Sequence, residues 1–335
     1  MDQRDRELLG ALQGDFPLVS TPFAFVGQSL DMSEKEVIKR TERLKREGIV
    51  RAIGAQFDSR ALGYRSCLVA ARIHPDRIDE AAGVVSAHPA VTQNYRRNND
   101  LNLWFTLLCS PYSKLGIDRT IEILGREAGC ETVRALPTLK LYKNNGEGDS
   151  SGEHEIHADY TPLTPLEIEC VRLLQRDLPL QPRPFDALAR TSNVAADEIL
   201  AAAKTLLKRG QIRRFSAVVP ARKQGFAASA MGVWVVPQEH ADDYAAKMVQ
   251  HRAVSHCYLR PTYDDWPYNL YTTVHARSVD ECESVINDLA VDSGVDKKQA
   301  LFPTKEYKKS RPCFFAREAD DWEDLHSADQ AAATG

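Results

Sequence analysis

Apolar residues along the chain recur first at helical spacing and then at strand spacing, and the same order returns in the second half. The pattern predicts helices over residues 4–13, over a short stretch after Pro22 and over residues 33–48, followed by a strand at 49–55. Ser33 and Glu36 have the spacing of a capping box at the start of the third helix. Three helices and a strand with a wing predict a winged helix-turn-helix.

A second pattern follows each predicted winged helix. In the first copy, strands and helices are expected in the order β-α-β-β-α-β over residues 67–73, 76–87, 91–97, 101–109, 113–127 and 131–142. In the second copy, the same order is expected over residues 228–236, 239–251, 253–260, 268–276, 279–289 and 297–307. This order is typical of a ferredoxin-like domain.

The two halves are copies of one arrangement. Gly48 and Gly210 lie 162 residues apart, as do Gly63 and Gly225, so we interpret the chain as a tandem duplication of α+β class. The predicted segments are winged helix-turn-helix 1 (1–60), ferredoxin-like domain 1 (61–144), a linker (145–162), winged helix-turn-helix 2 (163–222), ferredoxin-like domain 2 (223–316) and a mobile acidic tail (317–335).

Composition narrows the class of protein. The chain has 335 residues, of which 43% are hydrophobic, and no apolar run is long enough to cross a membrane, so a cytoplasmic protein is expected. Its seven cysteines show no C-x-x-C spacing, which predicts reduced thiols and no metal site of the protein's own. A net charge of −4 provides no overall attraction to nucleic acid.

A winged helix followed by a ferredoxin-like domain resembles the Lrp/AsnC type of transcription regulator, here fused head to tail. Those regulators pair through the open faces of their sheets, so the resemblance implies an intramolecular pseudo-dimer with a ligand pocket between the halves. In the third helix of the first copy, basic residues alternate with glutamates, and the corresponding helix at 197–204 begins with acidic residues. This charge pattern favours helices kept as scaffold over DNA readers.

One cluster in the second copy has the residue types of a chemical site. Alternation along a strand places Val254, His256, Tyr258 and Arg260 on one face. Trp266 and Tyr268 arrive on the following loop and strand. Aromatic rings, a guanidinium and an imidazole are suited to bind a flat ligand that carries several carboxylates. The alternative is a sheet face buried against its twin, in which the histidine and tyrosine are hydrogen-bonded core residues.

Two runs carry a second resemblance. His256-Cys257-Tyr258-Leu259-Arg260-Pro261 before Trp266-Pro267-Tyr268-Asn269-Leu270-Tyr271, and Asn94-Tyr95-Arg96-Arg97 before Asn102-Leu103-Trp104-Phe105-Thr106, resemble siroheme decarboxylases. The resemblance implies removal of carbon dioxide from the C12 and C18 acetates of siroheme, which gives 12,18-didecarboxysiroheme. A single fused chain is similar to the form that serves d-type heme synthesis; a route to protoheme uses separate subunits.

The resemblance and the cluster together assign roles to residues. His256 and His251 are expected as catalytic groups, either as proton donors or as axial ligands of the substrate iron. The substrate-binding set is expected to be Tyr258, Arg260, Trp266, Tyr268, Asn269, Arg97, Tyr95 and Lys305, with Arg260, Arg97 and Lys305 holding carboxylates. Gln93 stands where the family has a histidine in its first half, so the productive site is placed in the second half. His88, which matches His251, is interpreted as a helix-ending residue.

The expected partners follow from this assignment. Siroheme brings its own iron, and the reaction calls for no other cofactor. Neither DNA nor a membrane is expected as a partner, and a homodimer of fused chains is left open. Two alternatives remain: a transcription regulator that senses heme or an amino acid, and a siroheme carrier that binds without reacting.

Overall fold

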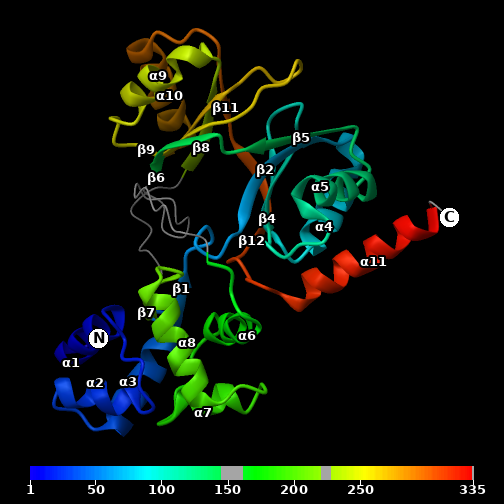
Figure 1. Cartoon of the computed structure of the whole chain (residues 1–335). Coiled ribbons are helices and arrows are strands. Elements are labelled where there is room, and N and C mark those ends of the chain that lie inside the picture. Colours follow the sequence, from blue (N-terminus) through cyan, green and yellow to red (C-terminus); the bar gives the residue numbers. More distant parts are fainter. Residues whose placement is uncertain (145–160, 220–227, 334–335) are drawn as a thin grey trace. The chain divides into compact units, whose positions relative to one another are not determined.

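The computed structural model describes residues 1–144, 161–219 and 228–333. The chain forms two compact units (Figure 1). One unit contains both winged-helix segments, Met1–Gly63 and His157–Arg222, with Cys313–Phe315; the other contains Tyr64–Ile156, Lys223–Pro312 and Ala316–Gly335. The linker predicted at 145–162 lies outside the described residues except for its last two positions.

The winged-helix unit has three helices and one strand from each copy. These are α1 (Gln3–Gln13), α2 (Pro22–Ser29), α3 (Glu34–Arg46) and β1 (Ala52–Phe57), and then α6 (Pro165–Leu174), α7 (Pro184–Ala189), α8 (Ala196–Lys208) and β7 (Ile212–Val218). β1 and β7 pair antiparallel with each other. The strand of each winged helix therefore pairs with the strand of the other copy. The sequence had instead suggested a separate wing for each copy.

The third helix of the first copy, α3, ends as the sequence predicts, but its start differs. Gly48 and Gly210 follow α3 and α8 with φ of 70° and 77°, a left-handed conformation that glycine adopts without steric cost. The Ser33 hydroxyl accepts the backbone N–H of Glu36 at 3.2 Å. The Glu36 carboxylate does not complete a capping box; it accepts a hydrogen bond from Nε of Arg40 at 2.8 Å.

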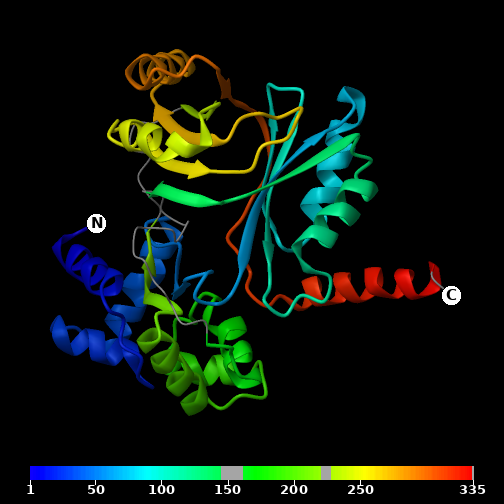
Figure 2. The same cartoon turned by 45° about the horizontal axis from the view of Figure 1, so that its top comes forward.

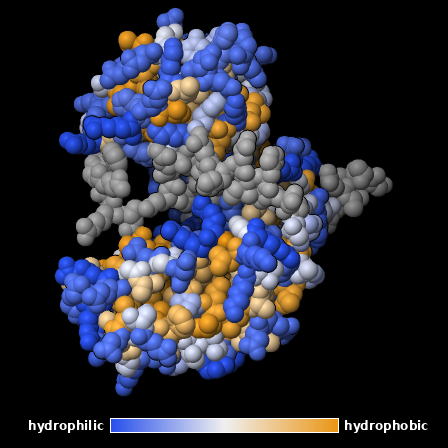
Figure 3. All heavy atoms as spheres, turned by 60° about the vertical axis from the view of Figure 1, so that its left-hand side comes forward, coloured by the Kyte–Doolittle hydropathy of each residue, from blue (hydrophilic) through white to orange (hydrophobic). Residues whose placement is uncertain are grey.

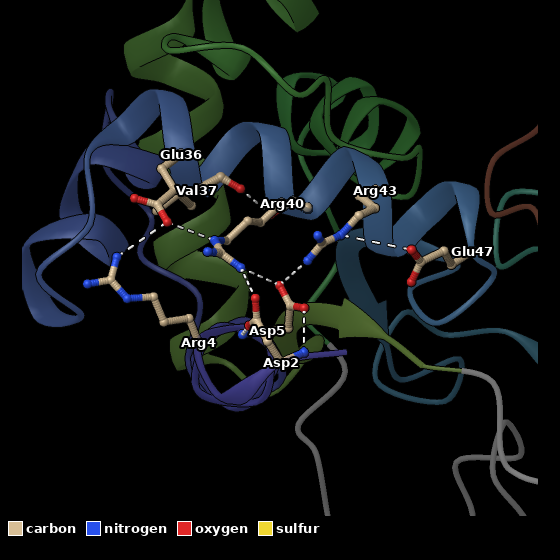
Figure 4. A network of polar contacts seen from close by, with 9 residues as sticks. Asp2, Arg4, Asp5, Glu36, Val37, Arg40, Arg43 and Glu47 are labelled. Atoms are coloured by element: carbon tan, nitrogen blue, oxygen red, sulfur yellow. Dashed lines mark hydrogen bonds and ion pairs between the residues drawn. The ribbon is translucent and has the colours of Figure 1, made fainter.

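Basic residues of α3 are bound to carboxylates of the same unit (Figure 4). Asp5 is 1% exposed, and its carboxylate accepts hydrogen bonds from Arg40 at 2.8 Å and from Arg43. Arg40 also donates to Asp2 at 2.8 Å. These ion pairs join α3 to α1. Because the carboxylates lie against the two guanidinium groups, they largely neutralise the positive charge of Arg40 and Arg43.

The second unit consists of two five-stranded sheets with helices. One sheet has the order β12-β3-β4-β2-β5 and the other the order β11-β8-β10-β9-β6. The first copy supplies β2 (Arg65–Arg72), α4 (Ile78–Ala87), β3 (Val91–Arg97), β4 (Leu103–Cys109), α5 (Gly116–Glu127), β5 (Thr132–Pro137) and β6 (Lys140–Asn144). The second copy supplies β8 (Ala228–Trp234), α9 (Ala241–Met248), β9 (Val254–Leu259), β10 (Leu270–Ala276), α10 (Val279–Ser293), β11 (Lys298–Leu301) and β12 (Pro303–Lys309). Short 3-10 turns at Pro75–Arg77 and Gln238–His240 precede α4 and α9.

The last strand of each copy is divided, and its second part joins the other copy's sheet (Figure 2). β6 pairs with β9, and β12 pairs with β3, both antiparallel. The sequence predicted one continuous strand over 131–142 and another over 297–307; each breaks near a proline, Pro137 or Pro303. Proline has no N–H for the sheet ladder, and the break lets the chain cross from one sheet to the other.

The two sheets pack against each other through a buried cluster, here called the central seam. It contains Ala70, Leu101, Trp104, Leu136, Val233, Trp266, Tyr271 and Leu301. Trp104 of the first copy and Trp266 of the second meet edge to face, with ring centroids 5.4 Å apart. Separate cores lie between each sheet and its helices. The predicted pseudo-dimer within one chain is confirmed.

The C-terminal segment is a helix, α11 (Arg317–Ala333), and the prediction of a mobile tail does not hold for its described side chains. Trp322 packs against the core of the first ferredoxin-like domain, and its ring lies 4.4 Å from that of His88. His326 contacts Glu127 at 2.7 Å. Composition suggested a tail because α11 is acidic, but the packing of Trp322 against His88 and the contact of His326 with Glu127 of α5 hold the helix on the first ferredoxin-like domain.

Apolar and polar residues are interspersed over the face of the molecule in Figure 3. The large apolar side chains that reach the surface include Phe25, Leu139 and Val291. Within the described part of the chain, no helix has the length and apolar character to cross a bilayer.

We expect Trp104→Ala to lower the free energy of unfolding of this unit by about 3–5 kcal/mol, because it leaves a cavity in the central seam. Denaturant titration followed by circular dichroism measures the change. Val291→Ala is the control, since that side chain is 81% exposed and its loss should change stability by less than about 0.5 kcal/mol. Equal effects of the two substitutions would contradict a stabilising seam.

Candidate functional site

Strand β9 contains a β-bulge at Ser255. Opposite it on β10, Thr273 pairs with His256 while Val274 pairs with Val254, so Ser255 is the inserted residue. Val254 therefore points into the core beneath α9 and α10. The prediction that Val254 shares a face with His256 is wrong, because simple alternation does not allow for an inserted residue.

His256 and Tyr258 of β9 do share one face with Arg260, which directly follows the strand. The rings of His256 and Tyr258 are nearly parallel, at 19°, with centroids 6.0 Å apart. The guanidinium carbon of Arg260 lies 4.9 Å from the centre of the Tyr258 ring. His256 and Tyr258 are half-buried, whereas Arg260 is buried. An imidazole, a phenol and a guanidinium thus follow one another along the strand, from its accessible end towards the central seam.

The bulge also orients the imidazole of His256. The Ser255 hydroxyl lies 2.7 Å from Nδ1 of His256 and donates to the carbonyl oxygen of Thr273 at 3.3 Å. Serine has one hydroxyl proton, so the donor in the contact between Ser255 and Nδ1 is set by the tautomer of the ring. An imidazole held at Nδ1 exchanges a proton or binds a metal through its other nitrogen, Nε2.

The two predicted arginines occupy equivalent positions and cross between the halves. Nη1 of Arg260 donates to the carbonyl of Leu136, and Nη1 of Arg97 donates to the carbonyl of Leu301 at 2.9 Å. Burial lowers the pKa of Arg97 to about 10, so its guanidinium is still cationic at neutral pH. Nε of Arg97 is buried without a hydrogen-bond partner, which leaves a donor suited to an anion.

Trp266 and Asn269 belong to the structural interior. Trp266 is 3% exposed and donates from Nε1 to the Tyr271 hydroxyl at 2.6 Å. The amide of Asn269 accepts the N–H of Val236 at 3.0 Å and donates to the carbonyl of the same residue at 2.8 Å. Tyr268 is half-buried against Trp266, with ring centroids 4.8 Å apart. Of these three predicted binding residues, Tyr268 has the greatest exposure.

His251 has the same position in its copy as His88. Nδ1 of His251 accepts the N–H of Ala253 at 3.2 Å, and Nδ1 of His88 accepts the N–H of Ala90 at 3.1 Å. Both histidines close the turn between a helix and a strand. The helix-ending interpretation made for His88 describes His251 as well, and a catalytic role for His251 stays a prediction.

Two further residues were predicted to bind the substrate, Lys305 of β12 and Tyr95 of β3, and they have different surroundings. Lys305 of β12 is exposed and bonds Asp79 of α4 at 2.9 Å, and Tyr307 also bonds Asp79. Lys305 is therefore on the helix-covered side of its sheet, and the structure does not bring it together with His256. Tyr95 is half-buried beside Arg97; burial and the neighbouring Glu306 raise its pKa to about 12.

The sequence reasoning missed His275 on β10. Tyr271 packs in the central seam and Val274 in the core under the helices, so Tyr271, Thr273 and His275 share the face of His256. The alternation Tyr271, Thr273, His275 was the signal that could have identified this second imidazole.

The described residues contain no cluster of three or more His, Cys, Asp or Glu that could hold a metal.

The face around His256 combines titratable imidazoles, aromatic rings and cations. Such a surface can stack a flat ring system, bind its carboxylates and deliver a proton.

Comparisons with known proteins agree with this arrangement. Residues 61–143 and 223–308 match the AsnC-like ligand binding domain, and residues 5–51 and 167–213 match the siroheme decarboxylase NirDL-like HTH domain. The chain is 33% identical over 322 residues to the siroheme decarboxylase of Hydrogenobacter thermophilus, covering 94% of this chain and 96% of that one. It is 32% identical to the siroheme decarboxylase NirDL subunit of Paracoccus denitrificans, over 85% of this chain and 89% of the relative.

A solved structure extends the likeness to three dimensions. The crystal structure of the siroheme decarboxylase NirDL in co-complex with an iron-uroporphyrin III analogue superimposes with a TM-score of 0.78 at 31% identity, over 97% of this chain and 99% of that one. The tandem arrangement of winged helices and ferredoxin-like domains is therefore confirmed by similarity in sequence and in fold.

The buried turn histidine predicts a pH effect on stability. Burial, with Lys308 and His326 nearby, lowers the pKa of His88 to about 4, while an unfolded histidine titrates near 6.5. Between these values the unfolded chain binds a proton that the folded chain does not. The free energy of unfolding should therefore fall as the pH drops from about 6.5 to 4, with up to about 3 kcal/mol from this residue.

His88→Asn keeps a side-chain acceptor for the turn and removes the titration. Denaturant unfolding at several pH values should show a shallower loss of stability in acid for His88→Asn than for the parent chain. His74→Asn is the control, because His74 is 61% exposed. Identical pH dependence of His88→Asn and the parent would show that His88 is not the buried titrating group.

Proposed function

Since this chain belongs to the siroheme decarboxylase family, we propose that it removes carbon dioxide from the C12 and C18 acetates of siroheme to give 12,18-didecarboxysiroheme. The observation that carries the proposal is the single face of β9 and β10 with His256 and Tyr258 half-buried beside Arg260. The fused form further supports a place in d-type heme synthesis.

The chemistry requires an ionised carboxylate and a proton for the carbon left behind. The bond between the acetate methylene and its carboxyl carbon breaks, its electrons pass into the conjugated ring, and carbon dioxide leaves. A proton then forms the new C–H bond of a methyl group. His256 supplies that proton from Nε2, and the Ser255 contact to Nδ1 keeps the ring oriented. Water restores the proton, so no cofactor other than the iron within the substrate takes part.

The binding residues have unequal support in the geometry. Tyr258 and Tyr268 offer half-buried aromatic surface to the ring system, and Arg97 with Arg260 places two guanidinium groups at the border of the central seam. We assign these four to the substrate. Trp266 and Asn269 support them from the interior, and Tyr95 lies beside Arg97. Lys305 is not assigned, because it pairs with Asp79 on the opposite side of its sheet.

The regulator alternative has less support. In α3, Arg40 and Arg43 are bound to Asp2, Asp5 and Glu36 (Figure 4), so their charge is not available to phosphates. In α8, the first turn carries Asp197 and Glu198, which repel phosphates. We therefore propose that the winged helices serve as scaffold and that the site acts on a tetrapyrrole rather than controlling DNA binding.

We expect His256→Gln to bind siroheme but to release carbon dioxide at least about 100-fold more slowly, because glutamine cannot deliver a proton at neutral pH. The first copy has glutamine at the equivalent position of β3, so the fold accepts this residue there. Anaerobic incubation followed by mass spectrometry measures the product, and the absorption spectrum of bound siroheme reports binding.

The same assay separates acid catalysis from iron ligation. Loss of the spectral shift together with weaker binding in His256→Gln would indicate that the imidazole ligates iron. Normal binding and normal turnover would overturn the site assignment. Ser255→Ala should retain binding and lower the rate less than His256→Gln does, because it removes only the contact that orients Nδ1.

We expect no salt-dependent DNA binding by the full chain. Fluorescence anisotropy with promoter fragments at about 50 and 200 mM salt should show no affinity that weakens by the orders of magnitude typical of phosphate contacts. An affinity that falls steeply with salt, in a chain that leaves siroheme unchanged, would favour the regulator over the decarboxylase.

A further inference from the structure

The loop between β9 and β10, residues 260–269, contains two residues assigned to the substrate, Arg260 and Tyr268. Its tip is closed by two backbone hydrogen bonds between Tyr263 and Trp266, each of 2.9 Å. Trp266 is buried, and its ring centroid lies 4.8 Å from that of Tyr268. The position of Tyr268 therefore depends on where the tip of the loop lies.

Strand β5 of the first copy binds the tip of this loop. The Arg134 guanidinium donates two hydrogen bonds to the Asp265 carboxylate, from Nε at 2.9 Å and from Nη2 at 3.1 Å. The next residue of β5, Ala135, accepts the hydroxyl of Tyr263 at its carbonyl oxygen, at 2.6 Å. Because β5 is the edge strand of its sheet, the loop of one copy lies along the border of the other.

Two further contacts join the loop to β5. The guanidinium carbon of Arg134 lies 4.9 Å from the centre of the Tyr263 ring, so the planar group binds a carboxylate and also stacks on an aromatic ring. The carbonyl of Leu136 accepts a hydrogen bond from Nη1 of Arg260. Three consecutive residues of β5 therefore hold the start of the loop and its tip.

The ion pair has the properties of a positioning contact. The side chains of Arg134 and Asp265 are 31% and 33% exposed, and ion pairs with such exposure contribute little to stability. A bidentate pair does, however, fix the relative orientation of the two groups. The pKa of Asp265 is lowered, first by the hydrogen bond from Arg134. We therefore expect the pair to determine the place of the loop more than the stability of the fold.

The corresponding loop of the first copy, residues 98–102, is joined to the second copy by amide side chains. Asn99 donates to the side-chain oxygen of Gln299 at 2.9 Å, and Asn98 accepts the N–H of Phe302 at 2.7 Å. This loop is also shorter. The scaffold thus connects the two copies at this place by neutral groups, and the charged pair belongs to the loop that carries substrate-binding residues.

We propose that Arg134 and Asp265 form a strap that positions the binding surface for the tetrapyrrole, by fixing the tip of loop 260–269 on β5 and so holding Tyr268 and Arg260 in place. The inference rests on the proposed function and adds two positioning residues to it. Both act through the residues that bind the ring system, and the proton-transfer step is left to His256.

Arg134→Met and Asp265→Asn each release the strap. We expect either substitution to raise the KM for siroheme about 10-fold and to leave kcat within about 2-fold, because binding lost equally from substrate and transition state changes KM alone. The initial rate of carbon dioxide release at several siroheme concentrations gives both constants. An unchanged KM in both variants, or a fall in kcat without a rise in KM, would overturn the proposal.

Asp264→Asn is the matched control, because Asp264 is the exposed carboxylate next to Asp265. Both aspartate-to-asparagine changes remove one negative charge from the same loop, which by itself favours a ligand with several carboxylates. Asp264→Asn should therefore keep KM at or below the parent value while Asp265→Asn raises it. Equal KM values in the two variants would show that charge alone matters and that the strap does not.

A charge reversal tests whether the two residues act as a pair. Arg134→Asp and Asp265→Arg should each raise KM, whereas the double variant restores an ion pair and should have a KM closer to that of the parent than either single variant has. If the two increases in KM simply multiply in the double variant, the residues act independently and the proposal fails.

Binding and loop order can be measured without turnover. With iron uroporphyrin III as the probe, an absorption titration should show about 10-fold weaker binding to Arg134→Met than to the parent. Hydrogen exchange of the empty variant should be faster at the amides of Tyr263 and Trp266 and unchanged in the strands of both sheets. Unchanged exchange in the loop, or faster exchange throughout the second unit, would show that the pair does not act as a strap.

The two levels of inference fail in different ways. If the parent chain releases no carbon dioxide from siroheme, the proposed function is wrong, and the binding titration with hydrogen exchange still decides whether the strap exists. If the parent chain is active and Arg134→Met and Asp265→Asn both match its KM, the function stands and the role of the strap is wrong.

Discussion

The exchange of β6 and β12 between the two sheets is the constraint on which the arrangement of the second unit depends. Each five-stranded sheet is completed only by a strand from the other copy, so the backbone hydrogen bonds of one copy are satisfied by the other. The arginine contacts to Leu136 and Leu301 and the packing of Trp104 on Trp266 cross between the same two copies. Without the other copy, neither ferredoxin-like domain has all its paired strands or all the side chains that pack against it.

A symmetric scaffold carries an asymmetric chemical face. Turn histidines, arginine-to-carbonyl contacts and lysine–aspartate pairs occur in both copies at matching positions. At the accessible end of the sheets the copies differ: His256 and His275 in one stand where Gln93 and Leu108 stand in the other. Because the fold is maintained by the shared residues, the second copy can place titratable groups there without loss of packing. Duplication thus separates the residues that hold the protein together from those available for chemistry.

Much of the fold could be predicted from the sequence because it rests on local patterns. Helical spacing, a serine N-cap and Gly48 at the helix end identified the first winged helix, and the repeat identified the second. Period-2 strands identified both ferredoxin-like domains. The candidate site was predicted in part: His256, Tyr258 and Arg260 do share a face. Val254 does not, because an inserted residue changes the direction of the side chains. Lys305 faces a helix, because its direction depends on the register of an exchanged strand, which no local pattern reveals.

The sequence by itself determined that two copies of one α+β arrangement are joined, that the second has the imidazole, phenol and guanidinium, and which known family they resemble. Those properties are local or repeat at fixed spacing. Only the tertiary structure decided that each copy completes the other's sheet, that Ser255 forms a bulge, and that α11 is docked. These depend on contacts between residues far apart in the chain, whose free energies are set by pairing and burial rather than by neighbouring residues.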